Sequence, residues 1–337
     1  MRSVEAQLLH RPPGLDAGEV VRRLLAVQAQ DITSAYLAFR ARSASLRLAD
    51  VEAAWRDREI VRAWGPRGTL HFVHADDLPW LHALTRRDTT ALRRLGQEGV
   101  TGDDLLSLIE GALAGQGPLT KAELEERLAG RARGQGVVHL VALAAFHGLA
   151  VLAPPRGGKP TYVHAADWLG APITPEPDRE RALAELARRY RRAHRPAEPE
   201  DLAAWSGLSL GEARTAWRLS GPDPDKPDNS DAPDPRPGEE ALARQAAGVP
   251  VRLIPAFDEF LLGWRSRDPV VPAAHARQVF PGGGILRPVV LADGLAAGVW
   301  ERKGPEVTVK PFGPLPAEPL AEEVADVRRF LSREEGR

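Results

Sequence analysis

Two amide side chains, Gln28 and Gln30, lie where one apolar helical stretch gives way to the next, within residues 24–31. An amide does not titrate, so neither residue can be a strong general base; its carbonyl oxygen can orient and polarise a water molecule. The same pattern is typical of a helix end, with Asp31 as the N-cap of the following helix. From the residues alone, the helix end is the favoured interpretation.

A second candidate is the acidic pair Asp258-Glu259, which stands inside the apolar run of residues 255–262. A carboxylate among apolar side chains needs a hydrogen-bonded or charged partner, or else it marks a functional site. We therefore expect either a structural ion pair with a nearby arginine or a role in a site.

Several other motifs have more ordinary explanations. Residues 207–211 match the Gly-x-Ser-x-Gly nucleophile motif, but a helical segment precedes them, and Ser209 stands three residues before Glu212, which predicts a helix cap. The chain contains no Cys, and His71 and His74 would point to opposite faces of a strand. Because it also lacks a His-Glu-x-x-His run and a Gly-Lys-Ser/Thr phosphate loop, we expect neither a metal nor another cofactor.

The clearest elements available to position such residues lie in residues 101–172. The pattern there predicts three helices followed by a strand–turn–strand hairpin, and Thr120 with Glu123 forms a capping box at the second helix. This order is typical of a winged helix, whose third helix can enter the DNA major groove. Arg156 and Lys159 would then stand at the hairpin tip, where DNA phosphates pass.

The same plan recurs in residues 1–100 and 173–254, which makes three winged-helix units in tandem. Residues 221–238, rich in Pro and Asp, are expected to form a disordered loop within the third unit. Residues 255–337 predict a small antiparallel β element with an Asp-Gly hairpin turn, and a closing helix. The expected fold is therefore mainly α with β wings, an α+β class.

The composition is that of an ordinary globular protein: 337 residues, 43% of them hydrophobic and 27% charged, with a net charge of −1. The N-terminus lacks the apolar core of a signal peptide, and His139 and His147 interrupt the long apolar stretch at residues 137–154. We therefore expect a soluble, cytoplasmic protein that does not enter a membrane.

Four blocks of sequence resemble the winged-helix DNA glycosylases of the AlkZ type, bacterial proteins often encoded beside genes for DNA-alkylating antibiotics. The blocks are residues 25–31, 62–71, 253–264 and 286–294, and the resemblance runs from about residue 15 to residue 330. Gln28-Ala29-Gln30 matches the Gln-x-Gln catalytic motif of this family. The insert at 221–238 and the Gly65-Pro66 pair depart from the family pattern.

The resemblance implies a monofunctional DNA glycosylase that hydrolyses the N-glycosidic bond of bulky, cationic N7- or N3-alkylpurines and leaves an abasic site. Such an enzyme would also unhook interstrand crosslinks made by a DNA-alkylating natural product, in antibiotic self-resistance or in alkylation repair. Gln28 and Gln30 would hold the attacking water, which requires an extended segment or a helix break. The partner would be double-stranded DNA carrying alkylated purines, bound by a monomer.

The resemblance also implies further site residues. Arg67, Thr69 and His71 would line the lesion site or contact phosphates, unless Arg67 pairs with an acid in the core and His71 is a satisfied buried imidazole. Asp258 would orient the Gln pair. The C-terminal hairpin would enter a DNA groove, or else form a covered sheet with charged edges. Its candidate cations are Arg287, Arg302 and Lys303.

Two functions from other classes remain alternatives. A winged-helix regulator would bind DNA without changing it, although such regulators usually dimerise on half-sites. A drug-sequestering protein would bind the free genotoxin. Neither would release a base from DNA.

Overall fold

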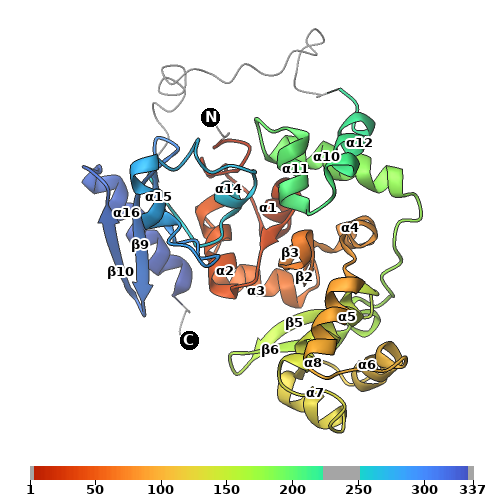
Figure 1. Cartoon of the computed structure of the whole chain (residues 1–337). Helices are drawn as coiled ribbons and strands as arrows, with labels where there is room; N and C mark the ends of the chain where they lie inside the picture. Colours follow the sequence, from red (N-terminus) through yellow and green to blue (C-terminus); the bar gives the residue numbers. More distant parts are fainter. Residues whose placement is uncertain (1–3, 223–250, 333–337) are drawn as a thin grey trace. The chain divides into compact units, whose positions relative to one another are not determined.

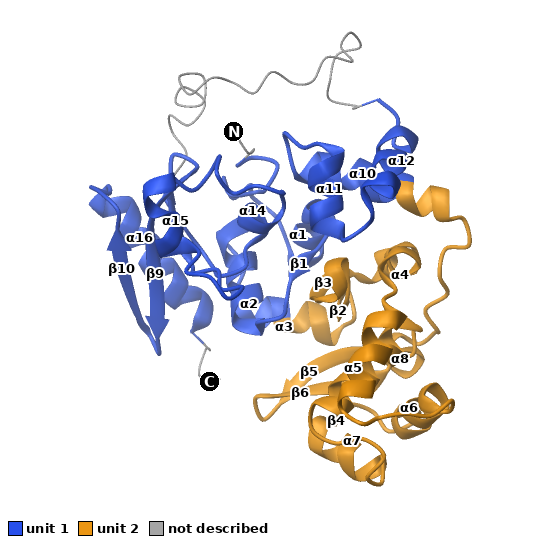
Figure 2. Cartoon of the chain, in the orientation of Figure 1, with its two compact units in different colours: residues 1–51, 184–337 blue, residues 52–183 orange. Residues whose placement is uncertain are grey.

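The computed structural model describes residues 4–222 and 251–332, and the chain divides into two compact units (Figures 1 and 2). Unit 1 comprises Met1–Val51 and Ala184–Arg337, and unit 2 comprises Glu52–Leu183. Helices α3 (Leu48–Arg56) and α10 (Arg179–Ala193) each pass from one unit into the other. Most of the predicted Pro/Asp-rich loop, residues 223–238, lies outside the described residues.

Unit 1 combines short helices with an antiparallel sheet in the strand order β10-β9-β8-β7. The strands are β7 (Arg252–Ile254), β8 (Val289–Ala292), β9 (Leu295–Lys303) and β10 (Glu306–Pro311). The other elements are α1 (Ala17–Leu24), β1 (Val27–Gln28), α2 (Ile32–Arg42), α11 (Pro199–Ser206), α12 (Leu210–Leu219), α14 (Glu259–Leu262), η3 (Ala273–His275), α15 (Ala276–Val279) and α16 (Ala317–Leu331). The C-terminal helix α16 packs against β7 and α2.

The sheet of unit 1 covers an apolar core that draws on distant parts of the chain. Buried residues of β7, β8, β9 and α14 pack there with Leu9 from the N-terminal segment and Ala41 from α2. Asp293 and Gly294, both with positive φ, form the predicted two-residue turn between β8 and β9. The sequence placed the strand at residues 251–255 in the third repeat, whereas β7 pairs with β8 of the C-terminal sheet.

Unit 2 holds strands in the order β3-β2-β5-β6-β4, with antiparallel pairing between neighbours. They are β2 (Ile60–Trp64), β3 (Leu70–His74), β4 (Leu119–Thr120), β5 (Ala150–Arg156) and β6 (Lys159–His164). The helical segments are η1 (Pro66–Gly68), η2 (Ala75–Asp77), α4 (Leu78–Thr85), α5 (Asp88–Gln97), α6 (Leu105–Leu113), α7 (Lys121–Arg127), α8 (Gln135–Phe146) and α9 (Ala165–Leu169). The buried helix α8 packs against α5, α6, α7 and β5.

Local signals in unit 2 act as the sequence predicts. The capping box of Thr120 and Glu123 opens α7, and β5 and β6 form the predicted hairpin. Its strands reach Arg156 and Lys159, and Gly157 and Gly158, both with positive φ, form the turn between them. The fold is thus a mixed α+β structure, as predicted, and its strands form two antiparallel sheets.

The apolar stretch at residues 137–154 is divided between two elements. It forms most of α8, which ends at Phe146, and then the first part of β5. Among the described helices, none has both the length and the apolar character needed to cross a membrane.

Candidate active site

Gln28 and Gln30 lie in an extended link between two helices. Helix α1 ends at Leu24, and Leu25 follows with a φ of 78°, which takes the chain out of the helical conformation. Val27 and Gln28 then form the short strand β1. Asp31 caps α2 by accepting a hydrogen bond from the Ser34 N–H at 2.6 Å. The break that the Gln-x-Gln hypothesis requires is therefore present, and so is the predicted cap at Asp31.

Burial alternates along this link, and the two glutamines are less buried than Val27 and Ala29. Val27 and Ala29 are buried, Gln28 is half-buried and Gln30 is exposed, as expected where alternate residues of an extended chain face opposite ways. The side-chain oxygen of Gln28 is itself buried, and among the described residues no hydrogen-bond donor reaches it. Gln28 thus carries a buried side-chain acceptor that no described donor satisfies, two residues before Gln30, whose side chain is exposed.

The buried carboxylate of Glu259 holds the backbone of Gln28. Its Oε1 accepts the Gln28 N–H at 3.1 Å, and its Oε2 accepts the indole N–H of Trp205 at 2.8 Å. Glu259 is only 1% exposed. The sequence marked Asp258-Glu259 as an unusual pair but assigned the orienting role to Asp258, because nothing in the sequence tells which carboxylate faces β1.

Asp258 is engaged elsewhere. Arg42 donates to both of its carboxylate oxygens at 2.8 Å, and both side chains are buried. Arg42 also donates to Gln7 at 3.3 Å, and Gln7 donates to the Ala193 carbonyl at 2.7 Å. This is the structural ion pair that the sequence left open for Asp258. The predicted orienting role of Asp258 stays a prediction.

Arg67, Thr69 and His71 lie in unit 2, at the turn between β2 and β3. His71 is fully buried, and its Nδ1 lies 3.0 Å from the Thr69 carbonyl oxygen. A carbonyl only accepts, so Nδ1 carries the proton and Nε2 is left as an acceptor. Burial lowers the pKa of His71 to about 3, with the positive charge of Arg67 acting in the same direction.

The backbone of this turn is fitted closely around the imidazole. Arg67 has a φ of 56°, and the Thr69 hydroxyl donates to the Pro66 carbonyl at 3.1 Å. A Cβ at Gly65 would lie 3.3 Å from His71 Nδ1, so a larger residue there would press on the ring. The Gly65-Pro66 pair, which departs from the family pattern, is thus part of the packing around His71.

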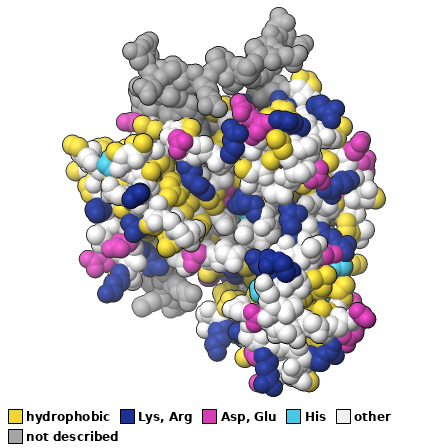
Figure 3. All heavy atoms as spheres, in the orientation of Figure 1, with side chains coloured by type: hydrophobic (Ala, Val, Ile, Leu, Met, Phe, Trp, Pro, Cys, Tyr) yellow, Lys and Arg dark blue, Asp and Glu magenta, His cyan; other side chains and the backbone are white. Residues whose placement is uncertain are grey.

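The predicted DNA-contacting cations are exposed and lie at or near hairpin turns. Arg156 and Lys159 flank the Gly157-Gly158 turn, and Arg156 pairs with Glu123. Arg287 donates to the Gln278 carbonyl at 3.2 Å, on the segment that leads into β8. Arg302 and Lys303 end β9. On the face drawn in Figure 3, Lys and Arg side chains are scattered among acidic and hydrophobic ones in both units.

The Gly-x-Ser-x-Gly match at residues 207–211 forms a helix cap, as predicted. Ser209 accepts the Glu212 N–H at 3.2 Å, and its hydroxyl donates to the Glu212 carboxylate at 2.8 Å. This reciprocal pair opens α12. A helix, α11, precedes the motif where a nucleophile elbow would require a strand.

A comparison with known protein families matches most of this chain. The chain belongs to the DNA glycosylase AlkZ-like family, which matches residues 21–333. It is therefore an enzyme that acts on N-glycosyl bonds, as the sequence predicts.

A curated sequence and a solved structure from Streptomyces sahachiroi are both similar to this chain. One is a curated protein named interstrand DNA cross-link repair glycosylase; it is 28% identical to this chain, and the alignment covers 97% of this chain and 94% of that protein. The other is the solved structure of the DNA glycosylase AlkZ, with a TM-score of 0.76 and 26% identity, covering 98% of this chain and 95% of that one. The similarity thus extends over nearly the whole of both chains.

Proposed function

We propose that this enzyme is a monofunctional DNA glycosylase that hydrolyses the N-glycosidic bond of bulky, cationic N7- or N3-alkylpurines in double-stranded DNA. Alkylation at N7 or N3 makes the purine cationic, so the base is already a good leaving group and needs no protonation. The enzyme must still hold a water against the anomeric carbon and offset the charge of the developing oxocarbenium ion. Amide oxygens can do both, because such catalysis rests on positioning and electrostatics.

One observation carries this proposal: the side-chain oxygen of Gln28 is buried, and no described donor reaches it. A buried acceptor without a partner costs about 1–3 kcal/mol. Native structures rarely keep such a group unless a water, an ion or a functional role explains it. We assign the orientation of the attacking water to Gln28, with Gln30 as the second amide of the site.

The relative's name supports one part of this proposal, the repair of interstrand crosslinks. The protein from Streptomyces sahachiroi is called an interstrand DNA cross-link repair glycosylase, and it aligns with nearly the whole of this chain. We extend that activity here: the enzyme would unhook interstrand crosslinks made by a DNA-alkylating natural product, in antibiotic self-resistance or in alkylation repair. Arg67, Thr69 and His71 would line the lesion site or contact phosphates. Asp258 would orient the Gln pair.

We also propose an architecture for binding DNA. The order α6, α7, α8, β5 and β6 supports a winged-helix unit at residues 101–172. Comparable units at 1–100 and 173–254 would precede and follow it, and residues 255–337 would add the C-terminal β element. The cations proposed to contact DNA are Arg156, Lys159, Arg287, Arg302 and Lys303. We propose a monomer that works without a metal or another cofactor.

The experiment uses duplexes that carry N7-methylguanine or a bulkier N7-alkylguanine. Released base is measured by mass spectrometry for the parent protein, Gln28→Ala and Gln30→Ala. We expect release by the parent and a loss of roughly 10²-fold in each variant, since each removes a preorganised group that acts in the transition state. Gln116→Ala, which changes an exposed glutamine in unit 2, is the matched control and should release base at the parent rate.

Each outcome decides between functions. Release that survives both substitutions would remove the two amides from the mechanism. If neither duplex loses a base while duplex binding is intact, a DNA-binding regulator or a drug-sequestering protein becomes the better interpretation. Release from the bulky lesion alone would point to resistance against a particular toxin.

A further inference from the structure

Glu259 connects the proposed catalytic segment to a helix that is distant in the sequence. Its carboxylate accepts the N–H of Gln28 through Oε1 and the indole N–H of Trp205, on α11, through Oε2. Trp205 is fully buried, and its ring centroid lies 5.4 Å from that of Tyr190 and 5.6 Å from that of His194. The indole is therefore held by packing, and it in turn fixes one oxygen of the carboxylate.

We propose that Glu259 is a positioning residue: with Trp205 as its anchor, it sets the backbone of Gln28 and thereby the direction of the Gln28 side-chain oxygen. The proposal deepens the proposed function and rests on it, because it concerns the residue that orients the attacking water. Strand β1 is only two residues long, and the bond between Glu259 and the Gln28 N–H holds one of these two residues directly.

The two donors explain why a carboxylate is required at this position. A carboxylate only accepts, so it can satisfy both N–H groups at once. A glutamine at residue 259 would have nearly the same shape, but it carries one accepting oxygen and one donating NH₂ group. One of the two N–H groups would then face another donor, and either Gln28 or the indole would move away.

The first test is the rate of base release by Glu259→Gln under single-turnover conditions, on the duplex that the parent protein cleaves. We expect a loss of about 10²-fold, the size of effect that a misplacement near 1 Å produces. Affinity for the same duplex should stay at the parent value, because Glu259 is buried and does not contact DNA. A variant that was merely misfolded would lose both.

The second test separates geometry from charge. In a Trp205→Phe background the indole donor is gone, so a glutamine at residue 259 can turn its oxygen toward Gln28 without placing its NH₂ group against a donor. We expect Glu259→Gln to slow release by less than about tenfold in this background. Trp300→Phe is the matched control, since Trp300 is also buried and donates to the Ile254 carbonyl in the same unit.

A spectroscopic measurement covers the case in which Glu259→Gln does not fold. The chain has eight tryptophans, and Trp205→Phe identifies the indole signal of Trp205 in a ¹⁵N-labelled sample of the full chain. We expect that signal at low field in the parent, as for a charge-assisted bond. Trp205→Phe alone should also slow release, because the carboxylate loses its anchor.

The outcomes distinguish this inference from the proposed function. If the parent protein releases no base, the proposed function fails first. The positioning role is wrong if the parent is active and Glu259→Gln releases base at the parent rate. It is also wrong if Glu259→Gln slows base release by the same factor in the Trp205→Phe background as in the parent. An indole signal for Trp205 at the position of a free indole, or Trp205→Phe at the parent rate, would also overturn it.

Discussion

At His71, burial decides which protonation state the imidazole adopts. The ring is fully buried, Nδ1 donates to the Thr69 carbonyl, and the pKa falls to about 3. The unfolded chain binds a proton near the ordinary pKa of about 6.5. The stability that His71 contributes is therefore present above pH 6.5 and is lost as the pH falls from there toward 3.

We expect the parent protein to lose about 2 kcal/mol of unfolding free energy through His71 between pH 7 and pH 5. In His71→Gln, residue 71 cannot titrate. Between pH 7 and pH 5, the unfolding free energy of this variant should therefore fall by about 2 kcal/mol less than that of the parent. Urea unfolding at both pH values measures the difference. His275→Gln is the matched control in unit 1. Equal pH dependence in the parent and His71→Gln would mean that the folded protein protonates His71 as readily as the unfolded chain does.

Residues that act through local sequence were predictable, and residues that act across the fold were not. The Gln-x-Gln pair follows from a family motif, and the extended segment around it is confirmed. Glu259 was missed because it is adjacent to Asp258 in the sequence, and only the fold shows which carboxylate meets Gln28, 231 residues away. Their other partners are also distant in the sequence: Arg42 lies 216 residues from Asp258, and Trp205 lies 54 residues from Glu259.

The same distinction holds for helices and strands. The starts of the capped helices at Thr120 and Ser209 were predicted to within a few residues. So was the position of the Asp-Gly hairpin turn at Asp293. These signals act over three or four residues, so the rest of the chain does not compete with them. Residues 252–254 were expected within the third winged-helix unit, whereas β7 pairs with β8 of the C-terminal sheet, because pairing depends on contacts between distant segments.

The cap of α12 allows a test at this scale. Ser209→Ala should lower the unfolding free energy by about 1 kcal/mol, the usual effect of removing an N-cap oxygen. Ser209→Asp keeps an acceptor and should recover most of that loss. Base release per folded molecule should be unchanged in both, because Ser209 is proposed to serve only the cap. A loss of release in a folded Ser209→Ala protein would return the serine to the list of nucleophile candidates.

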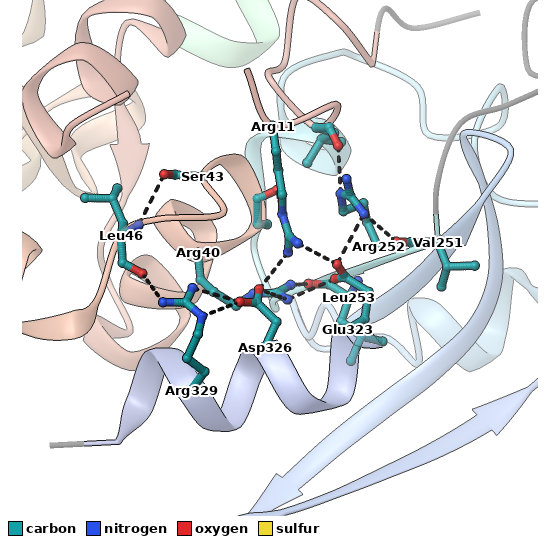
Figure 4. Close-up of polar contacts among 12 residues, drawn as sticks. Arg11, Arg40, Ser43, Leu46, Val251, Arg252, Leu253, Glu323, Asp326 and Arg329 are labelled. Carbon is teal, nitrogen blue, oxygen red and sulfur yellow. Dashed lines mark hydrogen bonds and ion pairs between the residues drawn. The ribbon is translucent and has the colours of Figure 1, made fainter. Parts of the chain in front are cut away.

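At the scale of the whole chain, both ends are joined within unit 1 by a cluster of charged side chains (Figure 4). Glu323 of α16 pairs with Arg11 at 2.8 Å, Arg40 at 2.9 Å and Arg252 at 3.2 Å. Asp326, one turn further along α16, also pairs with Arg11 and Arg40. Burial lowers the pKa of Arg11 to about 10, so its guanidinium still carries its charge at neutral pH.

Glu323 is the residue on which this cluster depends. It is 3% exposed, and Glu323→Gln would leave three arginines around a neutral amide. We expect a loss of about 3–5 kcal/mol in unfolding free energy, since removing one partner leaves buried charge uncompensated. The measurement is a denaturant midpoint at constant slope.

Glu318→Gln, an exposed position on the same helix, is the control and should stay within about 0.5 kcal/mol of the parent. Equal midpoints for Glu323→Gln and the parent would show that apolar packing of α16 on β7 and α2 is sufficient without the ion pairs. Release per folded molecule should survive Glu323→Gln, because the cluster holds the ends of the chain and the Gln28 backbone is held separately by Glu259. Loss of release with folding intact would instead couple the C-terminal helix to the catalytic segment.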